Sequence, residues 1–466
     1  MARRDLTTTR ISRGIIALAV PMVGANVLQS VQTMVDMYFV GGLGPEALAA
    51  VGMSGTIIMV LITVFMGIHS ATVAMIARAV GAGEEGRAEH VCGQAVLLTI
   101  LFSAVVSVAG FAIAPWLLRA LNAEPGVVSL GTGYLHVTFA GMFFLVSTFV
   151  LNGVLTGAGD AVTPMMLGAL ATVVNCVLNP IMIRGYLGFP ALGVSGSALA
   201  TVVARTIALG VGVWMLTRGQ LRVTPGLRDL VPALRTVRRF IVIGAPGSLQ
   251  MSTRMLMNLA LVAIVATFGT AAVAAYTVGV RLRMIGFMPL FGLAKASSAM
   301  VGQNLGAGRP DRAEQSAWVA LGYGLLAATV GAVFFFALAP HLVAFFNDAP
   351  EVVAIGTTFL RVTAVGLVAA AVGIVLSMAM NGAGDTLSPL VITIAVLWGF
   401  QMPCAIYLAG VSELWGVAIP FRDVFAFVSF GSETGIWVAM VVSAVIQAVA
   451  MAAWFSTGHW KKARVD

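Results

Sequence analysis

The tetrapeptide Gly-Ala-Gly-Asp stands at residues 157–160 of this chain and returns at residues 382–385, a shift of 225 (382 minus 157). The same shift places Gly81-Ala82-Gly83 on Gly306-Ala307-Gly308. Motifs that recur in one order and one register indicate an internal duplication of the whole chain. We therefore look for function where the two copies differ.

The composition determines the class of protein. Apolar residues make up 59% of the 466 residues, charged residues only 9%, and the mean hydropathy is +1.00. Such a chain cannot solvate a globular surface, so we expect an integral membrane protein, in which about 20 apolar residues span the bilayer as a helix. The expected spans are 14–39, 52–79, 91–117, 131–155, 163–184, 193–217, 241–267, 272–302, 316–342, 354–380, 389–409 and 433–456.

These twelve spans divide into six for each copy. Because six is even, each copy begins and ends on the same side of the membrane, and the copies are parallel. The expected fold is all-α, with twelve transmembrane helices arranged as two parallel six-helix repeats about a pseudo-twofold axis along the membrane normal. A duplicated membrane chain of this kind is typical of transporters built around a central pathway.

The distribution of arginine and lysine predicts the topology. They gather before the first span, between the copies and after the last span, so the positive-inside rule places both termini in the cytoplasm of a multi-pass protein of the inner, or plasma, membrane. The net charge of +8 reflects this topology and does not indicate nucleic-acid binding. The expected segments are a cytoplasmic start (1–13), an amino-terminal lobe (14–217), an Arg-rich cytoplasmic linker (218–240), a carboxyl-terminal lobe (241–456) and a cytoplasmic tail (457–466).

The sequence lacks the motifs of catalysis. Its five histidines never pair at helical spacing, its three cysteines form no CxxC motif, and no GxxxxGK[ST] loop is present. We therefore expect neither an enzyme nor an ATP-driven pump, with no cofactor and no metal beyond a coupling ion. The expected partners are a small-molecule substrate and membrane lipid. We expect the protein to be a monomer.

Charge inside the predicted spans is the strongest functional signal, because an ion at a helix centre costs at least about 2.5 kcal/mol. Asp36 is the acidic residue that lies deep in a span, and Gln32, Gln29 and Asn26 precede it at intervals of four, three and three. This spacing puts all four on one helical face. The face either lines a polar cavity or forms hydrogen bonds to another helix.

A second polar pair lies on the fifth span, where Asn175 and Asn179 are four residues apart and directly precede Pro180. Proline frees backbone carbonyl groups, so these amides either satisfy a kink or help to hold a cation. Together with Asp36 they could bind Na⁺ or tune the binding of a proton.

The second copy has a different charge. The 225-residue shift matches Asp36 with Leu261 and Gln29 with Arg254, so the seventh span carries Arg254 and Asn258 on the corresponding face. Lys295 adds a cation on the eighth span. Arg254, Asn258 and Lys295, with the Asn26, Gln29 and Gln32 amides, are the candidates to line the substrate cavity.

Several motifs resemble the multidrug and toxic compound extrusion (MATE) family over nearly the whole chain. They are Val35-Asp36-Met37-Tyr38-Phe39-Val40-Gly41, Val301-Gly302-Gln303-Asn304-Leu305-Gly306-Ala307-Gly308, the twin Gly-Ala-Gly-Asp turns and the entry to the sixth span at 193–201. The resemblance implies an antiporter that exports amphipathic, often cationic, drugs or toxic metabolites by alternating access, in exchange for Na⁺ or H⁺. It also implies a cation site formed by Asp36, Asn175, Asn179 and Ser197.

The chain departs from the family pattern at two places. Asn179 stands where one branch has a second carboxylate, and the seventh and tenth spans offer Arg254 and apolar residues around Ala370 where the sodium-coupled branch has acids. The coupling ion is thus left open between Na⁺ and H⁺. The alternative function is a flippase or exporter of a lipid-linked or anionic metabolite. A Phe-rich insertion at 410–431 is expected on the external face, as a cap or a long loop.

Overall fold

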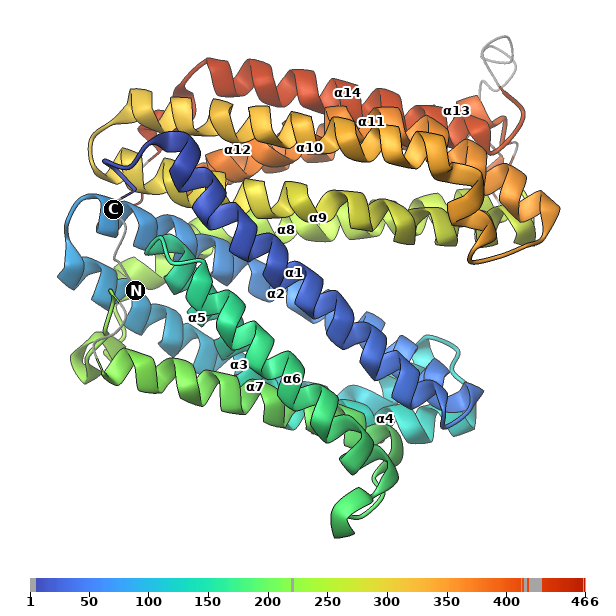
Figure 1. Cartoon of the computed structure of the whole chain (residues 1–466), viewed down its shortest axis with the longest axis horizontal. Helices are drawn as coiled ribbons and strands as arrows, with labels where there is room; N and C mark the ends of the chain where they lie inside the picture. The colour runs from blue at the N-terminus through green and yellow to red at the C-terminus, as the bar shows by residue number, and fades with distance from the viewer. Residues whose placement is uncertain are drawn as a thin grey trace. The chain divides into compact units, whose positions relative to one another are not determined.

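The computed structural model describes residues 6–218, 222–411, 413–414, 417–418, 430–463 and 465. Its chain is almost entirely helical (Figure 1), which confirms the predicted all-α class. Eleven helices among the described residues are long and apolar enough to cross a membrane, and a bent pair supplies a twelfth span.

The helices of the first copy are α1 (Ile11–Gly41), α2 (Pro45–Gly81), α3 (Glu85–Ala120), α4 (Pro125–Ala140), α5 (Met142–Gly157), α6 (Val162–Arg184) and α7 (Gly193–Thr217). Those of the second are α8 (Leu234–Ala266), α9 (Thr270–Gly306), α10 (Pro310–Ala344), α11 (Pro350–Ala383), α12 (Leu387–Ile394), α13 (Met402–Ala409) and α14 (Thr434–Ser456). Short helical turns are η1 (Tyr186–Gly188), η2 (Leu227–Leu230) and η5 (His459–Lys462).

The predicted span 131–155 is not one straight helix. It consists of α4 and α5, which meet at Gly141 with a bend of 54°. A Cβ atom at Gly141 would lie 2.4 Å from Val202 Cγ2 on α7. The glycine therefore permits a close approach of α7 at the bend, a packing constraint that hydrophobicity alone does not reveal.

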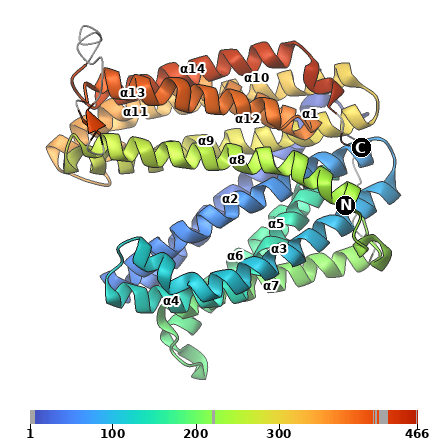
Figure 2. The same cartoon turned by 180° about the vertical axis from the view of Figure 1, so that it is seen from behind.

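The chain forms two compact units. Unit 1 comprises Met1–Ser248, Gly302–Arg309 and Val465–Asp466, and unit 2 comprises Leu249–Val301 and Pro310–Arg464. Within each unit the long helices run alongside one another, as Figure 1 and, from behind, Figure 2 show. The boundary between the units falls inside α8, after Ser248.

Equivalent glycines of the two copies allow equivalent helix contacts. In unit 1, a Cβ atom at Gly157 would lie 2.9 Å from the carbonyl oxygen of Val73. In unit 2, a Cβ atom at Gly382 would lie 2.2 Å from that of Ser298. Both pairs are related by the shift of 225 residues, so the duplication extends to the packing of α5 on α2 and of α11 on α9. Small residues at such contacts let the helix backbones approach closely inside a membrane.

The helix of the eleventh span, in unit 2, is interrupted by a wider helical turn. Between α12 and α13 the backbone forms a π-helix, η3 (Ala395–Gln401). The wider turn of a π-helix changes the direction in which the following side chains point, and such turns often occur at functional sites.

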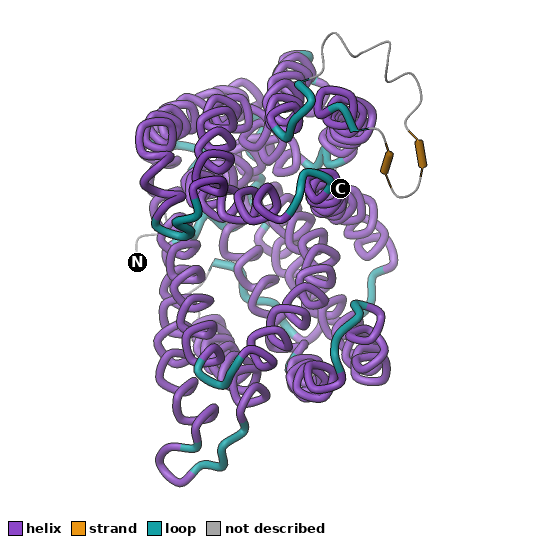
Figure 3. The backbone as a smooth tube through the Cα atoms, turned by 90° about the vertical axis from the view of Figure 1, so that its right-hand side faces the viewer, coloured by secondary structure: helices purple, strands orange, loops and turns teal. Residues whose placement is uncertain are grey.

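The insertion predicted at 410–431 contains a small hairpin. Strands β1 (Glu413–Leu414) and β2 (Val417–Ala418) pair antiparallel, with Glu413 opposite Ala418 (Figure 3). Residues 412, 415–416 and 419–429 lie outside the described residues. The cap or long loop predicted there lies largely outside the described residues, as do residues 1–5 of the cytoplasmic segment predicted at 1–13, and both stay predictions.

The glycine contact in unit 2 can be tested by adding one methyl group. We expect Gly382→Ala to destabilise the protein by about 1–3 kcal/mol, because the new Cβ collides with backbone rather than with a movable side chain. Gly322→Ala on α10 is the matched control, since no atom lies within 4 Å of its Cβ position. Thermal unfolding of purified protein in detergent measures both. Equal melting temperatures for the two variants would contradict the proposed close packing.

Candidate functional site

Three of the polar residues predicted in the first copy, Asp36, Asn175 and Asn179, come together in unit 1. The apolar run around Asp36 forms the long helix α1, and α6 packs against both α1 and α7. This packing brings the Asn175 and Asn179 side chains of α6 between Asp36 on α1 and Thr201 on α7. Asn175 and Asn179 are both completely buried.

A chain of hydrogen bonds connects the three helices. The Asn179 Nδ2 group donates to Asp36 Oδ1 in a short contact and also to Asn175 Oδ1 over 3.1 Å. Asn175 Nδ2 donates in turn to Thr201 Oγ1 over 3.0 Å. Asp36 is thus held by an amide whose own position is fixed by a second amide and a hydroxyl group.

One oxygen atom in this network has no partner. Asn179 Oδ1 is buried and accepts no hydrogen bond from the residues that the structure describes. A buried polar atom without a partner costs about 1–3 kcal/mol, so it calls for an explanation. The Oδ1 atom belongs to the same amide group whose nitrogen contacts the Asp36 carboxylate. The two residues could therefore offer oxygen atoms to one small cation, which prefers carboxylate and amide oxygens.

Two charged or polar residues near Asp36 were not among the predicted site residues. Arg205 on α7 and Tyr134 on α4 both interact electrostatically with Asp36. Arg205 follows Thr201 by four residues, one turn along the same face of α7. The rule that selected Asp36, a charge inside a span, would also have selected Arg205.

The other predicted residues of this copy differ in their surroundings. Ser197 lies on α7 one turn before Thr201 and is 2% exposed, but no hydrogen bond joins it to Asp36 among the described contacts. Along the polar face of α1, Gln32 is buried, Asn26 is half-buried and Gln29 is exposed. Of the residues on that face, Asp36 is the one whose side chain takes part in the described hydrogen-bond network.

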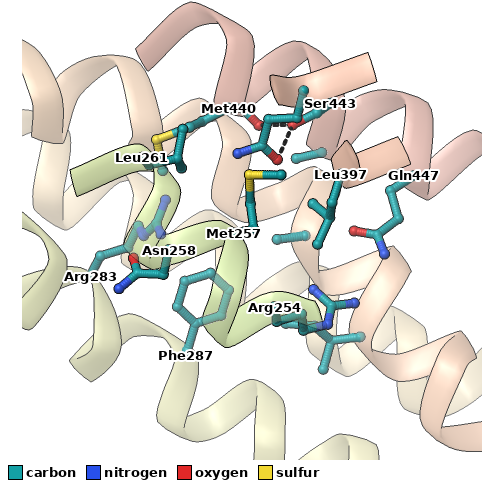
Figure 4. Close-up of a pocket in the computed structure, with 14 residues that line it drawn as sticks. Arg254, Met257, Asn258, Leu261, Arg283, Phe287, Leu397, Met440, Ser443 and Gln447 are labelled. Carbon is teal, nitrogen blue, oxygen red and sulfur yellow. Dashed lines mark hydrogen bonds between the residues drawn. The ribbon is translucent and has the colours of Figure 1, made fainter. Parts of the chain in front are cut away.

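Unit 2 contains a pocket of about 730 Å³, including its part open to solvent (Figure 4). Its walls come from α8, α9, α11, η3 and α14. Arg254 and Asn258, which we predicted to line a cavity, both lie in this pocket, and so does Leu261, the counterpart of Asp36. Lys295 on α9 is half-buried and is not among the lining residues.

Arg283 also lines the pocket, although the sequence singled out Lys295 instead. Its guanidinium group lies 5.6 Å from the ring centre of Phe287 and 5.8 Å from that of Phe359, within the range of cation–π attraction. Gln401, Ser443 and Gln447 are further polar lining residues that the sequence did not reveal. They converge only because η3 and α14 pack beside α8.

Comparison with known proteins shows which family shares this architecture. The MatE family model matches residues 21–181 and again residues 246–407, so its two matches begin 225 residues apart, as the internal repeat does. The chain belongs to the MatE family. Its resemblance to MATE proteins is thereby confirmed.

The similarity to curated relatives extends over nearly the full length of the chain. The chain is 27% identical to "Probable multidrug resistance protein NorM" of Thermotoga maritima over 98% of this chain and 94% of that protein. It is 26% identical to an FAD transporter of Shewanella oneidensis over 90% of this chain and 94% of that protein.

Two solved transporters show the same fold. One is the outward-facing conformation of a multidrug resistance MATE family transporter of the MOP superfamily, with a TM-score of 0.87, 25% identity and 98% of each chain covered. The other is a MOP superfamily transporter from Pyrococcus furiosus Vc1, with a TM-score of 0.86, 25% identity, 97% of this chain and 96% of that chain covered, and a binding pocket described as reversed in polarity.

The MatE protein is thus a multi-pass membrane transporter of small molecules and not an enzyme, as predicted. Its two polar regions, the Asp36 network and the pocket of unit 2, differ in sign of charge. They are therefore suited to different ligands.

The hydrogen-bond chain can be tested at Thr201. We expect Thr201→Val to lower the free energy of unfolding by about 1 kcal/mol, because Asn175 Nδ2 loses its acceptor while the side-chain shape is kept. Thr206→Val is the control, since the Thr206 hydroxyl bonds only the Val202 carbonyl of its own helix. Thermal unfolding in detergent measures both variants, and a larger effect of the control would contradict a network that links α6 to α7.

Proposed function

We propose that this MatE protein is a cation-coupled antiporter of the plasma membrane that exports amphipathic organic compounds by alternating access. Na⁺ or H⁺ would bind at Asp36, and both termini would lie in the cytoplasm. The protein would act as a monomer in contact with membrane lipid and without any other cofactor. The multidrug resistance names of its relatives support the export of drugs or toxic metabolites.

The observation that carries the coupling is the pairing of Asp36 with an amide that has a buried, unpartnered oxygen. A carboxylate and a neutral oxygen suit Na⁺, whereas the carboxylate alone suffices for a proton. The coupling ion can drive transport only if its affinity differs between two states of the protein. Three helices meet at Asn175 and Asn179, so any shift between α1 and α7 would change the ligands available to the ion.

A second candidate function is the export of an anionic or lipid-linked metabolite. The arginines of the unit 2 pocket favour it, since a cationic substrate would be repelled there. Similarity to an FAD transporter and to a transporter described by a reversed-polarity pocket supports the same candidate. Coupling at Asp36 is compatible with either substrate.

The coupling role of Asp36 is tested by Asp36→Asn. We expect this variant to insert normally and to reduce ethidium efflux from a drug-susceptible bacterial host to the level of cells without the protein. The amide keeps the shape of the side chain but can neither bind a proton nor neutralise Na⁺. Asp311→Asn, at an exposed acidic residue in the first turn of α10, should keep wild-type efflux. Normal efflux by Asp36→Asn at matched expression would disprove the assignment.

The identity of the ion is tested in liposomes that contain the purified protein. We expect an imposed Na⁺ gradient at constant pH and a pH gradient without Na⁺ each to drive substrate exchange, because both ions compete for Asp36. Asn179→Leu should weaken the sodium-driven exchange more than the proton-driven one, since it removes a neutral oxygen that only Na⁺ needs. If neither gradient moves any substrate of the wild-type protein, antiport is wrong.

A further inference from the structure

The pocket of unit 2 contains two cations and no acidic side chain. Arg254 from α8 and Arg283 from α9 both line it (Figure 4), while none of its lining residues is Asp or Glu. Four of the five elements that line it, α8, α9, η3 and α14, contain no acidic residue, and Glu351 of the fifth, α11, lies in the first turn of that helix and does not line the pocket. No described residue forms an ion pair or hydrogen bond with the Arg254 guanidinium group. The protein itself therefore leaves the positive charge of this pocket uncompensated in the described part of the chain.

One neutral amide of the pocket is oriented as a donor. The Asn258 Oδ1 atom accepts a hydrogen bond of 2.9 Å from the Tyr276 hydroxyl, so its NH₂ group is the part left for a ligand. The single proton of the Ser443 hydroxyl has two acceptors at 2.9 Å, Gln401 Oε1 and the Met440 carbonyl oxygen, so this contact does not fix the orientation of Gln401. Gln447 has the opposite orientation, because its Nε2 group donates to Thr393 over 3.2 Å.

Packing fixes the position of these donors. The Tyr276 ring stacks on Trp437 at 5.5 Å between ring centres, and Trp437 meets Phe359 edge to face at 4.7 Å. Phe359 in turn lies under the Arg283 guanidinium group. The same buried aromatic cluster thus holds both the hydroxyl that orients Asn258 and the ring that supports Arg283. A preorganised donor needs little rearrangement when a ligand binds.

We propose that this pocket is a binding site for the anionic group, a carboxylate or a phosphate, of an amphipathic organic molecule. A guanidinium group pairs with the oxygens of either anion in a bidentate manner. An intramembrane cation is costly unless it has a partner, and here the ligand supplies the missing negative charge. Phe287, Leu397 and Met257 provide an apolar wall for the rest of the molecule.

This inference rests on the transporter function proposed above only in that the bound molecule would be its substrate. Binding itself requires no ion gradient and is measured by calorimetry on the full-length protein in detergent. Two pairs of probes separate charge from shape. Flavin mononucleotide carries a phosphate that riboflavin lacks, and 2-naphthoate carries a carboxylate where 2-naphthamide is neutral.

We expect at least one anion to bind on the order of tenfold more tightly than its neutral twin, with the pair that responds identifying phosphate or carboxylate as the preferred group. Arg254→Gln and Arg283→Gln should each bring the ratio of the two affinities in that pair close to one. Arg254→Lys should keep part of it, because the charge remains and the bidentate geometry is lost. Arg281→Gln is the matched control, an exposed arginine on α9 two residues from Arg283 that does not line the pocket.

Equal affinity for both members of each pair, including no binding by any probe, would overturn the proposal. So would an Arg281→Gln variant that loses the preference as fully as Arg283→Gln, since general charge would then explain it. A purified Arg283→Gln that melts well below the wild type is replaced by Arg283→Lys, which should show the same partial loss as Arg254→Lys. Anion binding without any gradient-driven exchange would instead reject the antiport function and leave this site standing.

Discussion

Ions in a low-dielectric interior need compensation, and this constraint explains most of what is unusual in the structure. A charged side chain inside a membrane span is expensive unless a partner, a cavity or a ligand stabilises it. In unit 1 the Asp36 carboxylate is met by the Asn179 amide and, at longer range, by Arg205. In unit 2 Arg283 lies over two aromatic rings, and both Arg254 and Arg283 line a pocket without a carboxylate. Protein groups thus compensate the charge in unit 1, whereas none of the residues that line the unit 2 pocket is a carboxylate.

The duplication provides a common helical framework, and the two candidate sites lie where the copies differ. The glycine contacts at Gly157 and Gly382 are equivalent, so the same close helix packing serves both units. The exchange of Asp36 for Leu261 removes the carboxylate from the second copy, and Arg254 takes the place of Gln29. On this shared framework, the two differences replace a negative charge on α1 with a positive charge on α8.

Helix packing and aromatic stacking position the polar groups of both units. The π-helix η3 contributes Gln401, and the stack of Tyr276, Trp437 and Phe359 holds Asn258 and Arg283. In unit 1, α6 carries two buried asparagines between α1 and α7. In both cases an amide side chain links neighbouring helices, which suits a site whose ligands change when helices shift.

The sequence by itself determined the membrane class, the twelve spans and the duplication, and it singled out Asp36 as a candidate site residue, because hydrophobic length and the cost of buried charge are local properties. It also indicated Asn175, Asn179, Arg254 and Asn258. Tertiary structure alone decided that Asn179 reaches Asp36, that Arg283 rather than Lys295 lines the pocket, and that the fourth span bends at Gly141. These outcomes depend on which helices pack together and on how each is rotated. Contacts between residues far apart in the sequence set both, and no pattern within one helix records them.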